Sequence, residues 1–299
     1  MGKYTDIIGT DHLFFCFARE HRESDQELNM PIISTDWRPF HAESGEEEIF
    51  AIGDIHGQAD ALSALLTHMD AQPKRAARTF IQVGDLIDRG PDSLRACALA
   101  MSAQDLCDTR ILLPGNHEIM LLLALSDMDG DGVLWEMSGG DTVVAQIGLP
   151  QGINAQEKQN LIRNAFPEDF LDEIATGPTY FAREDLLFVH AGIHPHLNRS
   201  SFLGEARDSH VHSSQHWAWI RDPFLDWTKG WDDSWRQVVC HGHTPAVGHL
   251  MQTPSEVAQH LDKVQTHRRI CLDAGAAAGL AQAAMVQIYR GEYRIHIST

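Results

Sequence analysis

The stretch "IFAIGDIHG", Ile49 to Gly57, joins a short apolar run to a polar turn enclosed by glycines. Four consecutive apolar residues before a glycine are typical of a buried strand. Asp54 and His56 stand two residues apart directly after this strand, and both side chains can bind a metal ion. Packing alone does not require two such groups at the end of a buried strand, so the turn indicates a functional site.

Four further turns repeat this arrangement along the chain. They are "VGDLIDRG" (Val83–Gly90), "PGNHE" (Pro114–Glu118), "FVHAG" (Phe188–Gly192) and "CHGHTP" (Cys240–Pro245). Each follows a predicted strand, at residues 79–83, 110–113, 186–189 and 237–240, as the first turn follows the strand at 49–52. Open α/β sheets place their sites at the carboxyl ends of the strands, so we expect the five turns to converge.

The alternation of apolar runs and helical patterns predicts an α/β fold. Helices are expected at about 59–70 and 92–103 and from about residue 118, and the segment 127–176 is predicted to be mainly helical. Further strands are expected at 179–182, 269–272, 284–290 and 293–297. The pattern predicts two mixed β-sheets packed face to face, flanked by helices. Residues 1–48 are polar and lack clear periodicity, so we interpret them as an N-terminal extension to one domain over 49–299.

The composition limits the partners of the chain. Its 299 residues carry 42 acidic and 23 basic side chains, a net charge of −19. This balance disfavours a long nucleic-acid surface, which needs many Lys and Arg residues on one face. No apolar run approaches the ~18 residues that a membrane span needs, so we expect no membrane partner. The five cysteines form no C-x-x-C pair, which predicts a reducing, cytoplasmic location.

The polar residues of the five turns form a set of nitrogen and oxygen donors. The set is Asp54, His56, Asp85, Asp88, Arg89, Asn116, His117, His190, His241 and His243. Carboxylate, imidazole and amide donors without a thiolate suit Mn²⁺, Fe or Zn²⁺. Six of these residues, two Asp, one Asn and three His, are too many donors for one catalytic ion with open positions, and they suit two ions that share a carboxylate. An isolated D-x-H is more often a turn Asp beside a surface His, but that explanation would have to apply separately to all five turns.

The turns "GDIHG", "GDLIDRG", "GNHE", "HAG" and "HGHTP" together resemble the phosphoprotein phosphatase branch of the calcineurin-like metallophosphoesterases. This branch includes a phage protein phosphatase and small bacterial serine/threonine phosphatases. The resemblance covers about residues 49–297, which makes 49–299 the catalytic domain. It implies an αββα sandwich of two mixed β-sheets and a binuclear metal centre with two divalent ions, Mn²⁺ being favoured and Fe or Zn²⁺ being alternatives.

The resemblance also implies a role for individual residues. The first metal ion is expected on Asp54 and His56, and the second on Asn116, His190 and His243, with Asp85 bridging the two. His117 is expected to be a general acid that Asp88 orients. Arg89 is expected to bind the phosphate, with Asn116 nearby and with Arg221 of "WAWIRDPF" as a second arginine. His241 is the alternative to His243 as a ligand.

These roles predict a phosphatase that acts on phosphoproteins. A metal-bound hydroxide would attack phosphorus directly in a phosphoserine, phosphothreonine or other phosphorylated substrate, with tyrosine left open. The alternative is a symmetrical dinucleoside tetraphosphate hydrolase, in which the tryptophans between Trp217 and Trp235 could stack on adenine. Asp88, Glu118 and Thr244 favour the phosphatase. The sequence leaves the physiological substrate, the native metal and the oligomeric state open.

Overall fold

The computed structural model describes residues 30–209, 213, 215–245, 253–278 and 283–299. The chain divides into two units, Met1–Met30 and Pro31–Thr299. Every helix and strand named below belongs to the second unit. Of the predicted extension 1–48, residues 1–29 lie outside the described residues. Two short strands of the remainder, β1 (Ile32–Ser34) and β2 (Arg38–Pro39), pair with the last strand of the chain.

The larger sheet has seven strands in the described part of the chain. Its order is β1-β12-β11-β3-β4-β5, and β2 also pairs with β12. The other members are β3 (Glu48–Ile52), β4 (Arg78–Gln82), β5 (Thr109–Leu112), β11 (Ala284–Tyr289) and β12 (Glu292–Ser298). β3, β4 and β5 run parallel to one another, whereas β11 and β12 form an antiparallel hairpin. Arg290 and Gly291 both have positive φ in the hairpin turn, the backbone that a tight two-residue turn requires.

The smaller sheet has five described strands in the order β6-β7-β8-β10-β9. They are β6 (Tyr180–Arg183), β7 (Leu186–Val189), β8 (Val238–His241), β9 (Asp262–Lys263) and β10 (Arg269–Cys271). The three central strands β7, β8 and β10 are parallel, and the two edge strands are antiparallel to their neighbours. Both sheets are therefore mixed, as the sequence predicts, and each contains a group of three parallel strands.

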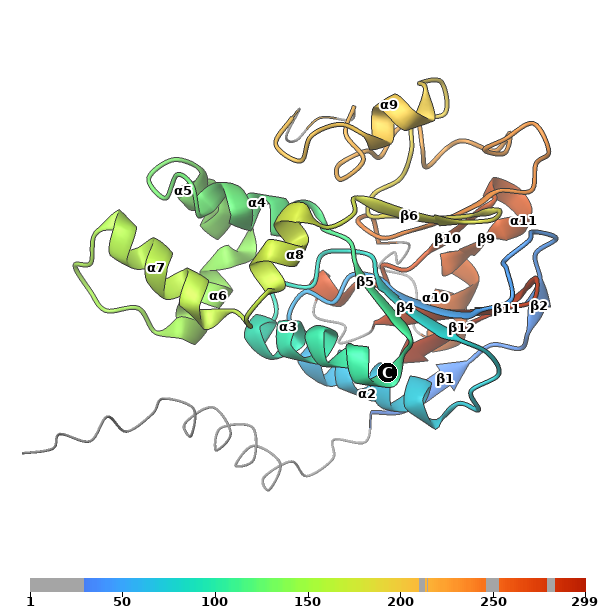
Figure 1. The fold of residues 1–299 in the computed structure, drawn as a ribbon, viewed down its shortest axis with the longest axis horizontal. Helices are drawn as coiled ribbons and strands as arrows, with labels where there is room; N and C mark the ends of the chain where they lie inside the picture. Colours follow the sequence, from blue (N-terminus) through green and yellow to red (C-terminus); the bar gives the residue numbers. More distant parts are fainter. Residues whose placement is uncertain (1–29, 210–212, 214, 246–252, 279–282) are drawn as a thin grey trace, which may run out of the picture. The chain divides into compact units, whose positions relative to one another are not determined.

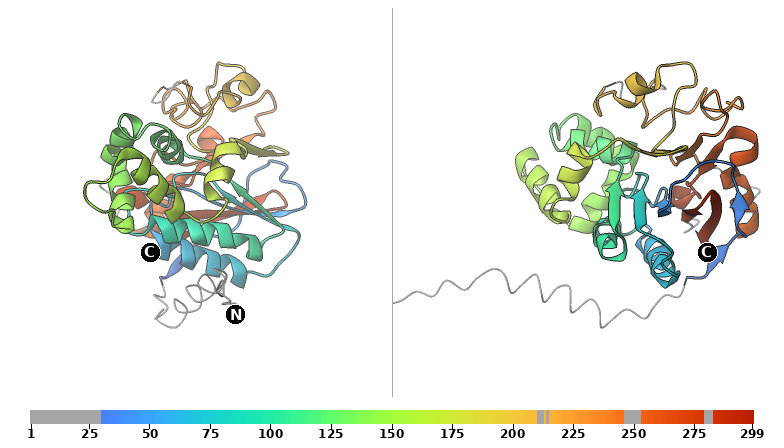
Figure 2. Two further views of the ribbon diagram at one scale, coloured as in Figure 1. Left: turned by 60° about the vertical axis from the view of Figure 1, so that its left-hand side comes forward. Right: turned by 45° about the vertical axis from the view of Figure 1, so that its right-hand side comes forward.

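The helices lie outside the sheets (Figures 1 and 2). α2 (Ala59–Ala71) and α3 (Ser93–Ser102) run along one side of the larger sheet. The predicted helical segment 127–176 is confirmed, and its helices gather with α4 at one end of the sheets. They are α4 (Asn116–Ala124), α5 (Asp131–Trp135), the π-helical turn η2 (Glu136–Gly140), α6 (Asp141–Ile147), α7 (Ala155–Ala165) and α8 (Phe170–Thr176). Shorter helices later in the chain are α9 (Arg199–Leu203), α10 (Pro254–Leu261) and α11 (Val264–His267).

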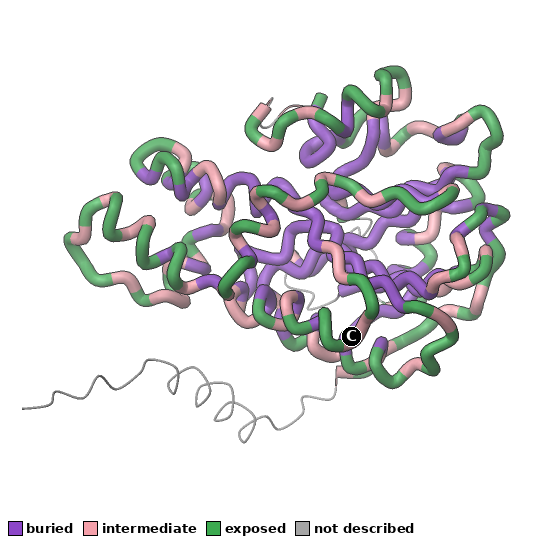
Figure 3. The backbone as a smooth tube through the Cα atoms, viewed as in Figure 1, coloured by how far each residue is buried: buried purple, intermediate pink, exposed green. Residues whose placement is uncertain are grey.

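One hydrophobic core joins the two sheets. Alternate residues of the larger sheet, such as Ile49, Val286 and Ile295, belong to the same buried cluster as Phe188 and Val238 of the smaller sheet. Side chains alternate between the two faces of a strand, so each sheet turns one apolar face toward the other. Figure 3 shows the buried backbone concentrated in the strands. This packing makes the fold an αββα sandwich and holds the ends of the strands in place.

Candidate metal centre

The carboxyl ends of six parallel strands carry polar side chains, three from each sheet. Asp54 and His56 follow β3, Asp85 to Arg89 follow β4, and Asn116 and His117 follow β5. In the smaller sheet His190 follows β7, His243 follows β8 and Asp273 follows β10. Five of these turns are the ones that the sequence identifies, and the distances below show that they meet. The sixth, with Asp273, has the same form in "ICLDAG" but was not predicted from the sequence.

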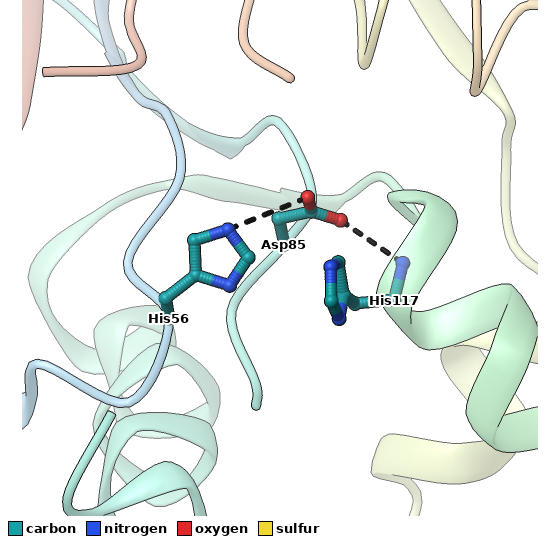
Figure 4. Close-up of side chains that lie close together, drawn as sticks. All are labelled: His56, Asp85 and His117. Atoms are coloured by element: carbon teal, nitrogen blue, oxygen red, sulfur yellow. Dashed lines mark hydrogen bonds and ion pairs between the residues drawn. The ribbon is translucent and has the colours of Figure 1, made fainter. Parts of the chain in front are cut away.

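His56, Asp85 and His117 form the first cluster of groups that could hold a metal ion (Figure 4). The Nε2 atom of His56 lies 3.6 Å from Oδ2 of Asp85 and 3.9 Å from Oδ2 of Asp54. The rings of His56 and His117 meet edge to face, 4.8 Å between centroids. All four side chains are buried.

Asp85, His190 and His243 form the second cluster. The Nε2 atom of His190 lies 3.3 Å from Oδ1 of Asp85. The Oδ1 atom of Asn116 lies 3.0 Å from Nε2 of His190 and 2.8 Å from Nδ1 of His243. Asp85 therefore directs one carboxylate oxygen to each cluster, which is the arrangement that a bridging ligand needs.

Backbone carbonyls orient two of the imidazoles. Nδ1 of His56 lies 3.0 Å from the carbonyl oxygen of Ile87, and Nδ1 of His190 lies 2.9 Å from that of Val83. A carbonyl can only accept, so Nδ1 of each ring carries the proton. Nε2 is then left with a lone pair that faces Asp85, as a metal ligand requires.

The backbone at the site is strained in a way that brings these side chains together. His56, Asp85, Asp88, Arg89 and His243 all have positive φ, between 46° and 71°. This conformation is uncommon for residues other than glycine and clusters at functional sites.

Two glycines leave room for the carboxylates. A Cβ atom at Gly115 would collide with Oδ1 of Asp85, and one at Gly242 would collide with Oδ1 of Asp54. The glycines of "PGNHE" and "HGH" are therefore needed for close approach of backbone to ligand.

Glu118 stabilises the turn that carries Asp85. Its carboxylate accepts hydrogen bonds from the backbone N–H groups of Asp85, Leu86 and Gly115, at 2.8, 2.8 and 2.7 Å. The turns after β4 and β5 are thus joined by one buried side chain.

The carboxylates of the site repel one another. Burial, followed by the negative charges of Asp273 and Asp85, raises the pKa of Asp54 well above its usual value. Burial also raises the pKa of Asp273, to about 6. For Asp85, burial raises the pKa, but the imidazoles of His190, His117 and His56 outweigh it and hold the pKa well below its usual value. Bound cations would relieve this repulsion.

The residues present fit a pair of divalent cations. The donors are carboxylate, imidazole and amide groups with no thiolate, the set that Mn²⁺, Fe and Zn²⁺ accept. Nε2 of His243 is buried without a hydrogen-bond partner in the described residues. Buried polar atoms normally have a partner, so this nitrogen fits the role of a metal ligand.

Asp88 connects His117 to a tryptophan that the sequence does not single out as part of the site. Nδ1 of His117 lies 2.7 Å from Oδ2 of Asp88, and Nε1 of Trp135 donates to the same oxygen at 2.9 Å. Burial raises the pKa of Asp88, and the hydrogen bonds from His117 and Trp135 oppose this. Nε2 of His117 has no described partner and belongs to the first cluster. Trp135 lies in a helix 47 residues from Asp88, and no local pattern links the two.

The two arginines lie close to the clusters. Nη1 of Arg89 is 3.3 Å from Nε2 of His56, and its backbone N–H donates to the carbonyl oxygen of Gly139. Arg221 is exposed, and its positive charge contributes, after burial and the charge of His190, to a strongly lowered pKa of His243. Arg89 is thus in contact with a residue of the first cluster, and the positive charge of Arg221 acts on a residue of the second.

His241 faces away from the clusters. Its Nε2 atom lies 3.2 Å from Nη1 of Arg269, and its ring packs edge to face on Phe224. Burial, followed by the charge of Arg269, lowers the pKa of His241 to about 3. The structure thus brings His243, and not His241, to Asp85.

Comparisons with known proteins agree with this geometry. The family described as calcineurin-like phosphoesterase matches residues 48–272. A stretch of 93 residues is 40% identical to serine/threonine-protein phosphatase 2 of Escherichia coli (strain K12), covering 31% of this chain and 38% of that protein. A stretch of 164 residues is 32% identical to the symmetrical bis(5'-nucleosyl)-tetraphosphatase of Delftia acidovorans, covering 54% of this chain and 50% of that protein. The matches thus span half or less of the length of these relatives.

A solved structure shares the fold. A mutant of a cold-active protein tyrosine phosphatase aligns with a TM-score of 0.52 at 15% identity, over 84% of this chain and 78% of that chain.

Among the described residues, no helix has both the length and the apolar character needed to cross a membrane.

Proposed function

We propose that this chain, which belongs to the calcineurin-like phosphoesterase family, is a phosphatase. Its proposed reaction is the removal of phosphate from phosphoserine or phosphothreonine in proteins. Membership makes the chain a hydrolase with a divalent-metal site. We propose Asp54, His56 and Asp85 as ligands of one ion and Asp85, Asn116, His190 and His243 as ligands of the other. Mn²⁺ is the ion we propose.

The observation that carries the proposal is the buried pair of His117 and Asp88, of which His117 belongs to the first cluster. A serine alkoxide is a basic leaving group, and its departure needs a proton. His117 donates Nδ1–H to Asp88, which leaves Nε2 free to hold a proton for the leaving oxygen. Asp88 and Trp135 keep the ring in this orientation.

The other residues bind and orient the phosphate. When bound, two divalent cations supply charge neutralisation for a phosphate dianion and activation of water as the nucleophile. Arg89 and Arg221 present planar guanidinium groups whose N–H donors match two phosphate oxygens. Arg89 is held for this role by the carbonyl oxygens of Gly139 and Ser138, which accept from its N–H and Nε–H groups.

A second candidate, hydrolysis of a dinucleoside tetraphosphate, is supported by a pocket next to the HAG turn. The pocket has a volume of about 270 Å³ and is lined by Ile193 and His194, three and four residues after His190. Trp227 and Trp231 form part of its wall, with Arg199 and Lys229. An indole and two cations suit a nucleobase and its phosphates. Trp217 and Trp219 are not among the residues that line this pocket.

A direct competition between substrates tests the proposal. The chain loaded with Mn²⁺ is assayed with a phosphoserine peptide, p-nitrophenyl phosphate and diadenosine tetraphosphate under identical conditions, with metal content measured in the same samples. We expect kcat/KM for the peptide to exceed that for diadenosine tetraphosphate. A higher value for diadenosine tetraphosphate, lost selectively in Trp227→Ala, would favour the second candidate.

A further inference from the structure

Three apolar residues of the helical segment 131–140 are exposed. Val133 is 50% exposed, Leu134 is 54% and Met137 is 81%. Val133 and Leu134 belong to α5, and Met137 belongs to the π-helical turn η2 that follows it. Trp135, between Leu134 and Met137 in the chain, is fully buried against Asp88. We name Val133, Leu134 and Met137 the apolar rim.

The apolar rim directly precedes, in the chain, the two residues whose carbonyl groups hold Arg89, the proposed phosphate-binding arginine. The carbonyl oxygen of Gly139 accepts from the backbone N–H of Arg89 at 3.0 Å, and that of Ser138 accepts from its Nε at 3.4 Å. Met137 is the neighbour of Ser138 in the chain. Consecutive Cα atoms are about 3.8 Å apart, so the Met137 side chain begins within one residue of the Arg89 contact. The apolar rim is therefore next in the chain to the carbonyl groups that hold Arg89.

The surroundings of the apolar rim are acidic. Residues 127–141 contain Asp127, Asp129, Asp131, Glu136 and Asp141 and no lysine or arginine. Glu136 pairs with Lys158 of α7, Oε1 to Nζ 2.5 Å, whereas Asp129 and Asp141 are exposed. A partner that covers this face must therefore bring apolar surface and positive charge.

We infer that the apolar rim binds the polypeptide substrate beside its phosphorylated residue and selects apolar and basic flanking residues. The inference rests on the proposed phosphoprotein phosphatase function and assigns its substrate class. Apolar side chains of the substrate remove Met137 and Leu134 from water, and lysine or arginine side chains approach the carboxylates around them. Acidic flanking residues are rejected by the same carboxylates.

Three phosphoserine peptides of equal length test the inference on the full chain with Mn²⁺. One has leucine and arginine next to the phosphoserine, one has leucine and glutamate, and one has glycine and serine. We expect the leucine–arginine peptide to have the highest kcat/KM, about tenfold above the leucine–glutamate peptide. In Met137→Ser we expect kcat/KM for the leucine–arginine peptide to fall about five- to tenfold, while that for p-nitrophenyl phosphate changes less than about twofold, because only the peptide reaches the rim.

Ile33→Ser is the matched control, because Ile33 is an exposed apolar residue, 43% accessible, on strand β1 at the opposite end from α5 (Figure 1). This variant should keep the peptide preference unchanged. Asp129→Lys should reduce the preference for arginine over glutamate. Two results would overturn the inference and leave the proposed function standing. One is hydrolysis of all three peptides at equal rates, and the other is an equal fall of kcat/KM for the peptide and for p-nitrophenyl phosphate in Met137→Ser. Hydrolysis of diadenosine tetraphosphate and of no peptide would overturn the proposed function together with it.

Discussion

His117 and Asp88 belong to different turns of the chain, yet Nδ1 of His117 lies 2.7 Å from Oδ2 of Asp88, and neither side chain is accessible to solvent. The contact fixes which nitrogen of the ring faces the metal clusters. Nε2 is left without a described partner at the side where His56 and Asp85 lie. The pair therefore has the geometry of a proton donor and its orienting group.

His117→Asn should slow hydrolysis of phosphoserine far more than hydrolysis of p-nitrophenyl phosphate. A positioned acid contributes ~10²–10⁴-fold when the leaving group is basic, and p-nitrophenolate leaves without much help. Asp88→Asn should act in the same direction by a smaller factor. The measurement is kcat for both substrates with equal metal content. If both substrates slow equally, His117 acts on the nucleophile or on metal geometry, and its role as an acid is wrong.

Asp85→Asn should lower the metal content and nearly abolish turnover, because one carboxylate serves both clusters. The loss should exceed the ~10–100-fold typical of an outer hydrogen-bond partner of a ligand. Metal analysis of the purified variant and its kcat with added Mn²⁺ check this. Two bound ions and a near-normal rate would contradict the bridging role.

Arg221→Ala should raise KM and lower kcat for phosphopeptides with the metal content unchanged. A lost hydrogen bond to a charged group corresponds to ~1.5–3 kcal/mol, so kcat/KM should fall about 10- to 100-fold. Arg221→Lys keeps the charge without the planar fork and should recover only part of the loss. The side chain is exposed, so the melting temperature should not change. A fall in metal content or unchanged kinetics would make Arg221 a structural residue.

Asp273→Ala should weaken Mn²⁺ binding about 10- to 100-fold, because Asp273 is a buried polar neighbour of Asp54, a proposed ligand, and such neighbours orient ligands. Asp273→Asn retains a polar partner and should weaken binding less. Titration of activity against free Mn²⁺ measures both variants. An unchanged Mn²⁺ dependence in Asp273→Ala would show that Asp54 needs no such support.

The free energy of unfolding should fall in mild acid through His296. Its ring is buried beside Ser34, His68 and Gln287, and burial, followed by the charges of His68 and Arg294, lowers its pKa to about 3. The usual pKa of about 6.5 applies in the unfolded chain, so between about pH 6.5 and 3 the unfolded state binds one more proton. The contribution is nearly absent above about pH 7 and reaches about 1 kcal/mol of destabilisation at about pH 5.5.

Urea unfolding of the chain and of His296→Gln at about pH 7.5 and 5.5 isolates this contribution from other titrating groups. Between the two pH values, the free energy of unfolding of the variant should fall by about 1 kcal/mol less than that of the unchanged chain. Equal losses would show that His296 does not titrate with the predicted shift.

The sequence by itself predicted the main strands and helices and five of the six turns at the site, but not the short strands β1, β2 and β9 or the helices α9, α10 and α11. Apolar runs such as 49–52 and 186–189 are local signals, and a strand buried on both faces shows them without reference to the rest of the chain. The repeated form of apolar strand, glycine and polar residue then predicted convergence, because the carboxyl ends of parallel strands in one layer lie together. The two clusters that share Asp85 join residues from these turns, as that reasoning predicts.

The tertiary structure decided which side chains face the centre. His241 and His243 are two residues apart in one turn, and the positive φ of His243 sends its ring to Asn116 while His241 remains on Arg269. Trp135 reaches Asp88 only because α5 folds back over the turn after β4, and Asp273 reaches Asp54 only because the two sheets pack face to face. Such contacts join residues far apart in sequence, so hydrophobic periodicity, which reports local burial, contains no information about them.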